Sequence, residues 1–364
     1  MKLTRLLPAI LAIASVMPSF AAKKNYVYTD ASKLTMVNRA QPDCPFLARL
    51  DTTKYRDLNK YMNTYYNYPT GMALVFETNS PDIAARWTTH DAFTRSNTMG
   101  IASRGLDLYI LQDGKWVTAG TGSPRAYGKK HSGNIVTDMD RSMKTCLLYL
   151  PIFDRLESLS IGIDSASVIR PVANPWKKKV VFMGSSITHG AGVSRPGTTY
   201  PARIARALGV EAPNLGISGQ CKMEPVLAQI IADTDADAFV FDCFSNPNAQ
   251  QIRERLMPFV EIIRKAHPTT PLIFLQTERR ETRNFDLGKR AFEEERTATS
   301  ASEMEKVMKK FNDVYFINPG MPLGDDHEGC VDGVHPTDLG TYRIAEGITP
   351  QLRAILAKYG IVEK

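Results

Sequence analysis

VVFMGSSITHG, residues 180–190, places a short apolar run before a glycine and two adjacent serines. A continuous apolar run that ends at a turn signal is typical of a buried strand in a parallel sheet. In open α/β sheets the functional side chains gather in the loops after the carboxyl ends of the strands, and Ser185 and Ser186 occupy such a place. The stretch therefore predicts an α/β fold and makes a reactive serine a hypothesis to test against the rest of the chain.

Three known motifs fail at this turn. A phosphate-binding loop needs a lysine after its second glycine, whereas Ala191 follows Gly190. The dinucleotide pattern G-x-G-x-x-G is absent. The nucleophile elbow G-x-S-x-G needs a glycine where Thr188 stands. A serine nucleophile of another kind remains, and it requires a base, a carboxylate that orients the base, and donors for an oxyanion.

A candidate base and carboxylate lie near the other end of the chain. GCVDGVHPTDLG (329–340) contains Asp332 and His335 just before the last predicted helix. Pro336 fixes the backbone after the histidine, and Asp338 can cap the helix. A loop of this size lets the aspartate reach Nδ1 of the imidazole and fix its tautomer, which leaves Nε2 to take a serine proton. The D-x-x-H pattern is weak alone, but together with the serine turn it predicts a hydrolytic triad.

From Trp176 onward, short apolar runs alternate with helical patterns. The runs that predict buried parallel strands lie at 179–183, 238–243, 271–276 and 313–317. QQIRERLMPFVEIIRKAH (250–267) places its apolar residues on one helical face, and DLGTYRIAEGITPQLRAILAKYG (338–360) closes the chain similarly. Strands that alternate with helices predict an open parallel sheet covered on both faces.

Residues 25–171 have a different pattern of predicted secondary structure. Their short aromatic and β-branched segments, punctuated by Gly, Asn, Asp and Pro, predict a β-sandwich. LDLYILQDGKWVTA (106–119) predicts a hairpin that turns at Asp113-Gly114, whereas RDLNKYMNTYYN (56–67) could form one helix or a loop. ASVIRPVANPWKKK (166–179) is the natural linker to the second half.

The N-terminus predicts export. MKLTRLLPAILAIASVMPSFAAKK (1–24) begins with two positive charges, continues with an apolar stretch and ends in small residues, so we expect a signal peptide over 1–21 that is cleaved after Ala21. The stretch is shorter than the ~20 residues that span a bilayer, which makes an uncleaved membrane anchor the less favoured alternative. We therefore expect a periplasmic or secreted protein without membrane insertion after cleavage.

Composition excludes several classes of function. The formal net charge of +7 includes two charges of the predicted signal peptide, and the remaining basic residues are scattered, so no nucleic acid is expected as a partner. Five cysteines stand at positions 44, 146, 221, 243 and 330, without zinc-ligand spacing and too few for a disulfide framework. Neither their pairing nor the oligomeric state follows from the sequence.

The quoted blocks resemble the SGNH (GDSL-type) hydrolases. GSSITHGAGVSRPGTTYPARIA (184–205), NLGISGQCKMEP (214–225), FDCFSNP (241–247) and VDGVHPTDLG (331–340) look like the successive blocks of this family, through about residues 177–358. Gly105-Leu106-Asp107-Leu108-Tyr109 resembles the G-x-D-L-Y signature of a two-domain bacterial branch. The resemblance implies a three-layer, flavodoxin-like hydrolase domain over 177–364 with a parallel sheet, preceded by a jelly-roll-like β-sandwich accessory domain over 25–171.

The resemblance also implies the roles of individual residues. Ser186 matches the nucleophile, and Ser185 stands where many members have aspartate. Asp332 and His335 match the final aspartate and histidine. The oxyanion hole would be formed by the backbone N–H groups of Ser186 and Gly219 and by the side-chain amide of Asn246. Asn248 remains an alternative to Asn246, because the segment reads Ser-Asn-Pro-Asn rather than G-x-N-D.

Other polar residues have simpler interpretations. We expect Ser185 to be a supporting hydroxyl, and His189 lacks an aspartate at useful spacing. His327 is expected in a solvated acidic loop rather than a metal site, and Arg279 and Arg280 could bind an acidic substrate group, although charged loop residues usually face water. Trp87 and Trp116 are expected in core packing rather than in a sugar platform. Cys221, Cys243 and Cys330 are expected to be small apolar wall residues of the site.

These features together predict a carboxylic ester hydrolase. We expect an exported serine esterase that removes short acyl groups, acetyl above all, from a small-molecule or polysaccharide substrate through an acyl-enzyme, without a cofactor or metal. The alternatives are a lipolytic esterase or thioesterase, and a carbohydrate-binding protein with an inactive hydrolase domain.

Overall fold

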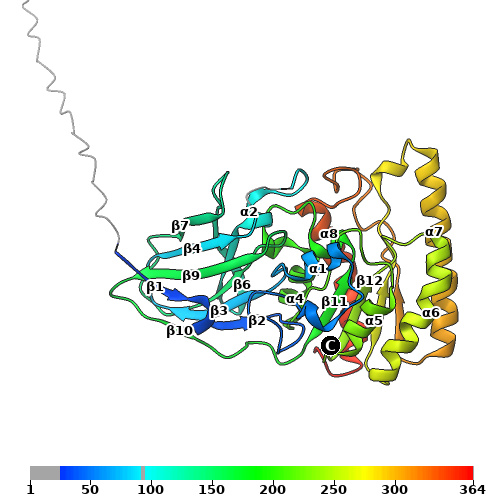
Figure 1. Cartoon of the computed structure of the whole chain (residues 1–364), viewed down its shortest axis with the longest axis horizontal. Coiled ribbons are helices and arrows are strands. Elements are labelled where there is room, and N and C mark those ends of the chain that lie inside the picture. Colours follow the sequence, from blue (N-terminus) through cyan, green and yellow to red (C-terminus); the bar gives the residue numbers. More distant parts are fainter. Residues whose placement is uncertain (1–24, 92–94, 364) are drawn as a thin grey trace, which may run out of the picture.

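The structure, a computed structural model, describes residues 25–91 and 95–363. The predicted signal peptide and its cleavage site after Ala21 lie outside the described residues. A β-rich N-terminal part and an α/β C-terminal part lie side by side along the long axis of the molecule (Figure 1). Within the described ranges, no helix is both long enough and apolar enough to cross a membrane.

The N-terminal part is a sandwich of two antiparallel sheets, as predicted. One sheet has the order β1-β9-β4-β7, and the other has the order β10-β3-β8-β5-β6 with β2 also paired to β3. The elements are β1 (Tyr26–Asp30), β2 (Thr35–Val37), α1 (Lys60–Tyr66), β3 (Ala73–Thr78), β4 (Ile83–Thr89), α2 (Gly100–Arg104), β5 (Leu106–Gln112), β6 (Lys115–Gly122), β7 (Lys130–Val136), β8 (Lys144–Tyr149), β9 (Leu156–Asp164) and β10 (Ile169–Pro171).

Alternating residues of both sheets form the core of the sandwich. Phe76 from one sheet and Trp87 from the other belong to the same buried cluster. The predicted hairpin is β5–β6, and both of its turn residues, Asp113 and Gly114, have positive φ (49° and 76°). The predicted linker is partly built into the sandwich, because β10 pairs with β3 and Trp176 packs beside Tyr149.

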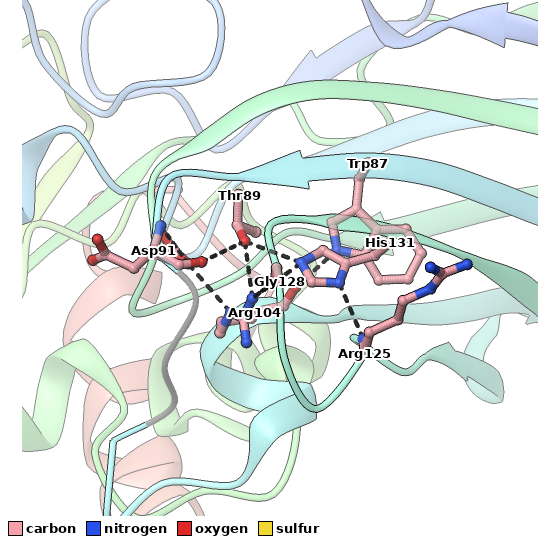
Figure 2. A network of polar contacts seen from close by, with 8 residues as sticks. Trp87, Thr89, Asp91, Arg104, Arg125, Gly128 and His131 are labelled. Carbon is pink, nitrogen blue, oxygen red and sulfur yellow. Dashed lines mark hydrogen bonds and ion pairs between the residues drawn. The ribbon is translucent and has the colours of Figure 1, made fainter.

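A buried polar network joins one edge of the sandwich to helix α2 (Figure 2). Nδ1 of His131 accepts a hydrogen bond from the Arg125 backbone at 3.0 Å, so the neutral ring carries its proton on Nε2, which lies 3.0 Å from the Thr89 hydroxyl. Trp87 Nε1 donates to the Arg104 carbonyl at 2.9 Å, and the Arg104 guanidinium pairs with buried Asp154 at 3.4 Å. Burial and the charges of Arg104 and Arg125 lower the pKa of His131 to about 4.

The C-terminal part is an open parallel sheet with the order β11-β12-β13-β14. Its elements are β11 (Val180–Gly184), α3 (Ser186–His189), α4 (Tyr200–Leu208), α5 (Pro225–Ala232), β12 (Ala238–Asp242), α6 (Ala249–Ala266), β13 (Leu272–Leu275), α7 (Leu287–Lys310), β14 (Val314–Ile317) and α8 (Asp338–Ala357). The four predicted strands are therefore confirmed. The sequence did not reveal that residues 211–215 extend the sheet at the free edge of β11, because Pro213 interrupts this segment, a residue that is tolerated at an edge strand.

Helices cover both faces of this sheet, which makes three layers. Val180 and Phe182 point to a cluster shared with α4 and α8, whereas Val181 and Met183 point to a cluster shared with α5, α6 and α7. This alternation along β11 explains why the strand reads as uninterrupted apolar sequence. The predicted α/β architecture is confirmed.

The two parts share a core. Leu50, Met62 and Tyr66 from the N-terminal part belong to the cluster under the parallel sheet, and α1 lies among the C-terminal elements in Figure 1. Arg49 is buried and donates to the carbonyl oxygens of Asn214 and Gly216, both at 2.8 Å. The core of the C-terminal α/β part is therefore completed by residues that come before the sandwich strands β3–β10.

Candidate active site

Ser186 begins the short helix that follows the first parallel strand. Ser185 is the N-cap of α3, because its hydroxyl accepts from the Ile187 backbone at 3.1 Å and donates to Asp242 Oδ2 at 3.1 Å. Thr188 donates to the same carboxylate oxygen at 2.8 Å. Asp242 ends β12, so two neighbouring strands hold the turn that presents Ser186.

Ser186, His335 and Asp332 form one hydrogen-bonded chain. The Ser186 Oγ and His335 Nε2 atoms are 2.9 Å apart, and His335 Nδ1 lies 2.8 Å from Asp332 Oδ2. The other carboxylate oxygen of Asp332 accepts from the His335 backbone at 2.9 Å. This geometry leaves Nε2 as the nitrogen that can take a proton from the serine.

Asn97, from the N-terminal part, forms a hydrogen bond with Asp332. Its Nδ2 donates to Asp332 Oδ2 at 3.0 Å and lies 3.3 Å from His335 Nδ1. Burial would raise the pKa of Asp332, but hydrogen bonds from Asn97 and His335 outweigh it and hold the pKa well below its ordinary value. The carboxylate therefore stays ionised beside the imidazole. No pattern in the sequence pointed to Asn97.

Gly219 and Asn246 face the same cavity as Ser186. Gly219 has φ of 71°, a left-handed conformation that glycine adopts without strain. The side-chain oxygen of Asn246 accepts from the Cys221 backbone at 3.2 Å, which leaves its NH₂ group as the donor. Asn248 has a structural role, because it caps α6 in a reciprocal capping box with Gln251. Of the two asparagines left open by the sequence, Asn246 is the one at the cavity.

The cavity has a volume of about 730 Å³ and draws on both parts of the chain. Its lining includes Tyr65, Arg95, Ser96 and Asn97 from the N-terminal part, and Ser186, Ala191, Ser218, Gly219, Ser245, Asn246, Arg280, Phe292, Arg296, Val334 and His335 from the C-terminal part. We expected charged residues of the loop after β13 to face water. This is wrong for Arg280, because the loop lies over the site and Arg280 lines the cavity. Arg279 borders a separate small hollow with His327. The sequence analysis missed Arg95 and Arg296.

The two other histidines that the sequence analysis considered, His189 and His327, do not line this cavity. His189 is fully buried, with Nε2 2.8 Å from the Ile152 carbonyl and Nδ1 3.3 Å from the Ser218 backbone nitrogen. Burial and nearby arginines hold the pKa of His189 well below its ordinary value. His327 is exposed and lies 2.8 Å from Glu281. Within the described residues, no group of three or more His, Cys, Asp or Glu side chains could hold a metal ion.

The predicted cap of the last helix is wrong. Thr337, not Asp338, caps α8 by accepting from the Gly340 backbone, and Asp338 instead accepts hydrogen bonds from Ser194 and Thr198. The reason is register: α8 begins at Asp338, one residue earlier than a cap at Asp338 would require.

The cysteines lie behind the cavity rather than in its wall. Cys221 and Cys243 belong to the core under the sheet, with their sulfur atoms 3.3 Å apart. Burial raises the pKa of Cys243 well above its ordinary value and that of Cys330 to about 11, which disfavours reactive thiolates. The expected wall of thiols is wrong because these side chains turn toward the core. Trp87 is buried, as expected, and Trp116 packs against Trp176.

Two family models match successive regions of the chain. Residues 177–353 match the model of the GDSL-like lipase/acylhydrolase family, and residues 26–169 match the GxDLY N-terminal region of SGNH-hydrolase-type esterases. A solved structure described as a GDSL-like lipase from Bacteroides ovatus has 42% identity and a TM-score of 0.89, with 92% of this chain and 98% of that chain covered.

The chain belongs to the GDSL-like lipase/acylhydrolase family. It is a carboxylic ester hydrolase of the SGNH type, as the sequence blocks indicated. Its fold is also similar to that of a salicylyl-acyltransferase from a tetracycline biosynthetic pathway (19% identity, TM-score 0.70, 92% of this chain and 98% of that one). A family two carbohydrate esterase from Cellvibrio japonicus has the same fold at 12% identity (TM-score 0.61, coverage 92% and 99%). No curated protein matches the chain.

Proposed function

We propose that this hydrolase is an exported serine esterase that removes short acyl groups, acetyl above all, from carbohydrate. The observation that carries the proposal is the hydrogen-bonded chain from Ser186 through His335 to Asp332, which opens into the same cavity as Gly219 and Asn246. An inactive hydrolase domain would have no need of this arrangement.

The geometry supports a two-step mechanism. Ser186 Oγ attacks the ester carbonyl carbon while its proton passes to His335 Nε2, and Asp332 stabilises the imidazolium. The negative charge on the carbonyl oxygen is held by the Ser186 and Gly219 N–H groups and the Asn246 amide. The ester C–O bond then breaks, and His335 returns the proton to the leaving alcohol. Water, deprotonated by His335, attacks the acyl-enzyme, releasing the acid and restoring Ser186.

Three features support the substrate and location. The cavity lining is mostly polar, with serines, asparagines and arginines, which favours a short acyl group on a hydrophilic alcohol over a long lipid chain. Two structures of a family two carbohydrate esterase from Clostridium thermocellum, one of them an active-site mutant, share the fold and include a complex with cellohexaose, which supports carbohydrate esters as the substrates to test. The N-terminal sequence supports export by its resemblance to a cleavable signal peptide.

A chain-length series tests the proposal. The purified mature chain should hydrolyse p-nitrophenyl acetate with the highest kcat/KM, with lower values for butyrate and octanoate, and should release acetate from an acetylated polysaccharide. The mechanism routes no step through a metal, so a chelator should leave the rate unchanged. A preference for octanoate would instead favour a lipolytic esterase, and hydrolysis of none of these esters would contradict the proposal.

A further inference from the structure

The cavity around Ser186 is strongly cationic. Arg95, Arg280 and Arg296 line it, and its lining contains no aspartate or glutamate among the described residues. A cleft lined by charges of one sign attracts ligands of the other sign. The question is whether these arginines are already neutralised by neighbours inside the protein.

Among the described residues, the side chain of Arg95 contacts neutral groups. Its guanidinium lies 4.3 Å from the centroid of the Phe153 ring, and it donates to the Ser218 hydroxyl at 3.4 Å and the Tyr65 hydroxyl at 3.3 Å. Both hydrogen bonds are long, and a guanidinium has five N–H donors. Stacking on an aromatic ring holds the group in place while leaving its charge and most of its donors available for a ligand.

Arg280 and Arg296 share a single close carboxylate. Both donate to the Ser245 carbonyl, at 2.7 and 3.0 Å, and both lie 3.8 Å from Glu293. One negative charge thus faces two positive charges. Burial and the charge of Arg280 lower the pKa of Arg296 to about 10, as expected for a buried cation that is incompletely compensated.

Two further buried carboxyl groups, Asp242 and Glu278, interact with Arg280 and Arg296. They neutralise the positive charge of the two arginines poorly. Burial raises the pKa values of Asp242 and Glu278, and for Glu278 the charge of Asp242 adds to this effect. A proton is therefore retained on this pair toward neutral pH, which removes negative charge from the cluster. The cavity keeps an excess of positive charge beside the reacting serine.

We propose that the alcohol part of the substrate carries a carboxylate that Arg95, Arg280 and Arg296 bind, so that the preferred substrates are acylated acidic sugars. This inference rests on the proposed function, since an acetyl group is too small to carry the charge and the anionic group must belong to the alcohol. The planar fork of arginine suits the two oxygens of a carboxylate. Arg95 is the main specificity residue, because it alone of the three is not committed to a buried carboxylate and a backbone carbonyl.

Matched aryl acetates test this assignment. The esters 3-acetoxybenzoate and 3-acetoxybenzamide differ in charge but little in shape, and we expect kcat/KM to be at least about tenfold higher for the benzoate at low salt, with the ratio falling as salt rises. Arg95→Gln should bring the ratio close to one, and Arg95→Lys should retain part of it. Arg170→Gln is the matched control, because Arg170 is exposed, pairs with Glu77 and lies outside the cavity lining; its ratio should equal that of the wild type.

The outcomes separate this inference from the proposed function. Hydrolysis of both esters with equal kcat/KM would overturn the carboxylate site and leave the esterase intact, whereas hydrolysis of neither would contradict the esterase itself. A preference for 3-acetoxybenzenesulfonate over the benzoate would overturn the choice of a carboxylate. On polymers, acetate release from an acetylated polyuronate should exceed release from the same polymer with methyl-esterified carboxylates.

Discussion

Asn97 links the N-terminal part to the catalytic chemistry through a single side chain. It donates to Asp332, the carboxylate that orients His335. A hydrogen bond to a charged group contributes about 1.5–3 kcal/mol, so Asn97→Ala should lower kcat for p-nitrophenyl acetate roughly 10–100-fold. KM should change little, because Asn97 acts through Asp332 rather than on the ester. Steady-state kinetics with a parallel melting curve would measure both effects.

The control for this variant is its neighbour. Ser96 also lines the cavity, but among the described residues it is Asn97, not Ser96, that donates a hydrogen bond to Asp332, so Ser96→Ala should keep kcat near that of the wild type. A rise in KM with unchanged kcat for Asn97→Ala would show that Asn97 binds substrate instead of positioning the aspartate.

At the level of residues, the sequence predicted the site residues that stand in short motifs. It missed the site residues that come from the surface of the N-terminal part. Ser186, Asp332 and His335 stand in short blocks whose spacing has a chemical reason, and the structure brings them within hydrogen-bond distance of one another. Arg95 and Asn97 reach the site only because the two parts dock. Nothing local in the chain encodes that contact.

The turn between β11 and α3 is the element on which the site depends. A Cβ on Gly184 would lie 2.1 Å from the Thr188 hydroxyl and 2.9 Å from Asp242 Cβ. Gly184→Ala should therefore displace the turn, destabilise the protein by about 1–3 kcal/mol and strongly reduce esterase activity. Chemical denaturation and an acetate-ester assay would measure the two effects.

Gly347 provides the matched control. It lies in α8, where an added Cβ would meet nothing within 4 Å. Gly347→Ala should leave activity unchanged and stabilise the helix by about 0.5–1 kcal/mol. Equal effects of the two substitutions would contradict the packing argument at Gly184.

At the level of elements, the sequence predicted the strands whose apolar pattern matches their burial in the structure. The four parallel strands are buried on both faces, so their apolar runs are uninterrupted and easily recognised. The edge segment at 211–215 has few pairing residues and a proline, and the first turn of α8 depends on which hydroxyl or carboxylate caps it. Such features are decided by tertiary contacts that a single sequence does not display.

The whole molecule should unfold as one unit, because the two parts share a core. Arg49 donates to Asn214 and Gly216 across the boundary. Arg49→Met would leave these buried carbonyl groups without partners and should cost at least about 3 kcal/mol. The exposed Arg56→Met should change stability by less than about 0.5 kcal/mol. Calorimetry that resolved two independent transitions in the wild type would contradict the shared core.

The buried network of Figure 2 predicts a pH dependence of stability. The pKa of His131 falls from 6.5 to about 4 on folding, so the unfolded chain binds a proton that the folded chain excludes between these values. The contribution of neutral His131 to the free energy of unfolding is fully present above pH 6.5. It is lost as the pH falls through the folded-state pKa of about 4. In melting curves, the stability difference between the wild type and His131→Gln should therefore shrink over this window; a constant difference would show that His131 titrates normally.

The identity of the nucleophile is the central claim, and labelling tests it most directly. A fluorophosphonate should attach to Ser186, as located by peptide mass mapping, and Ser186→Ala should abolish both labelling and ester hydrolysis with an almost unchanged melting temperature. Ser185→Ala should still be labelled and retain substantial turnover, because the Ser185 hydroxyl caps α3 and bonds Asp242 rather than His335. A label found on Ser185, or a Ser186→Ala protein that keeps its rate, would contradict the account.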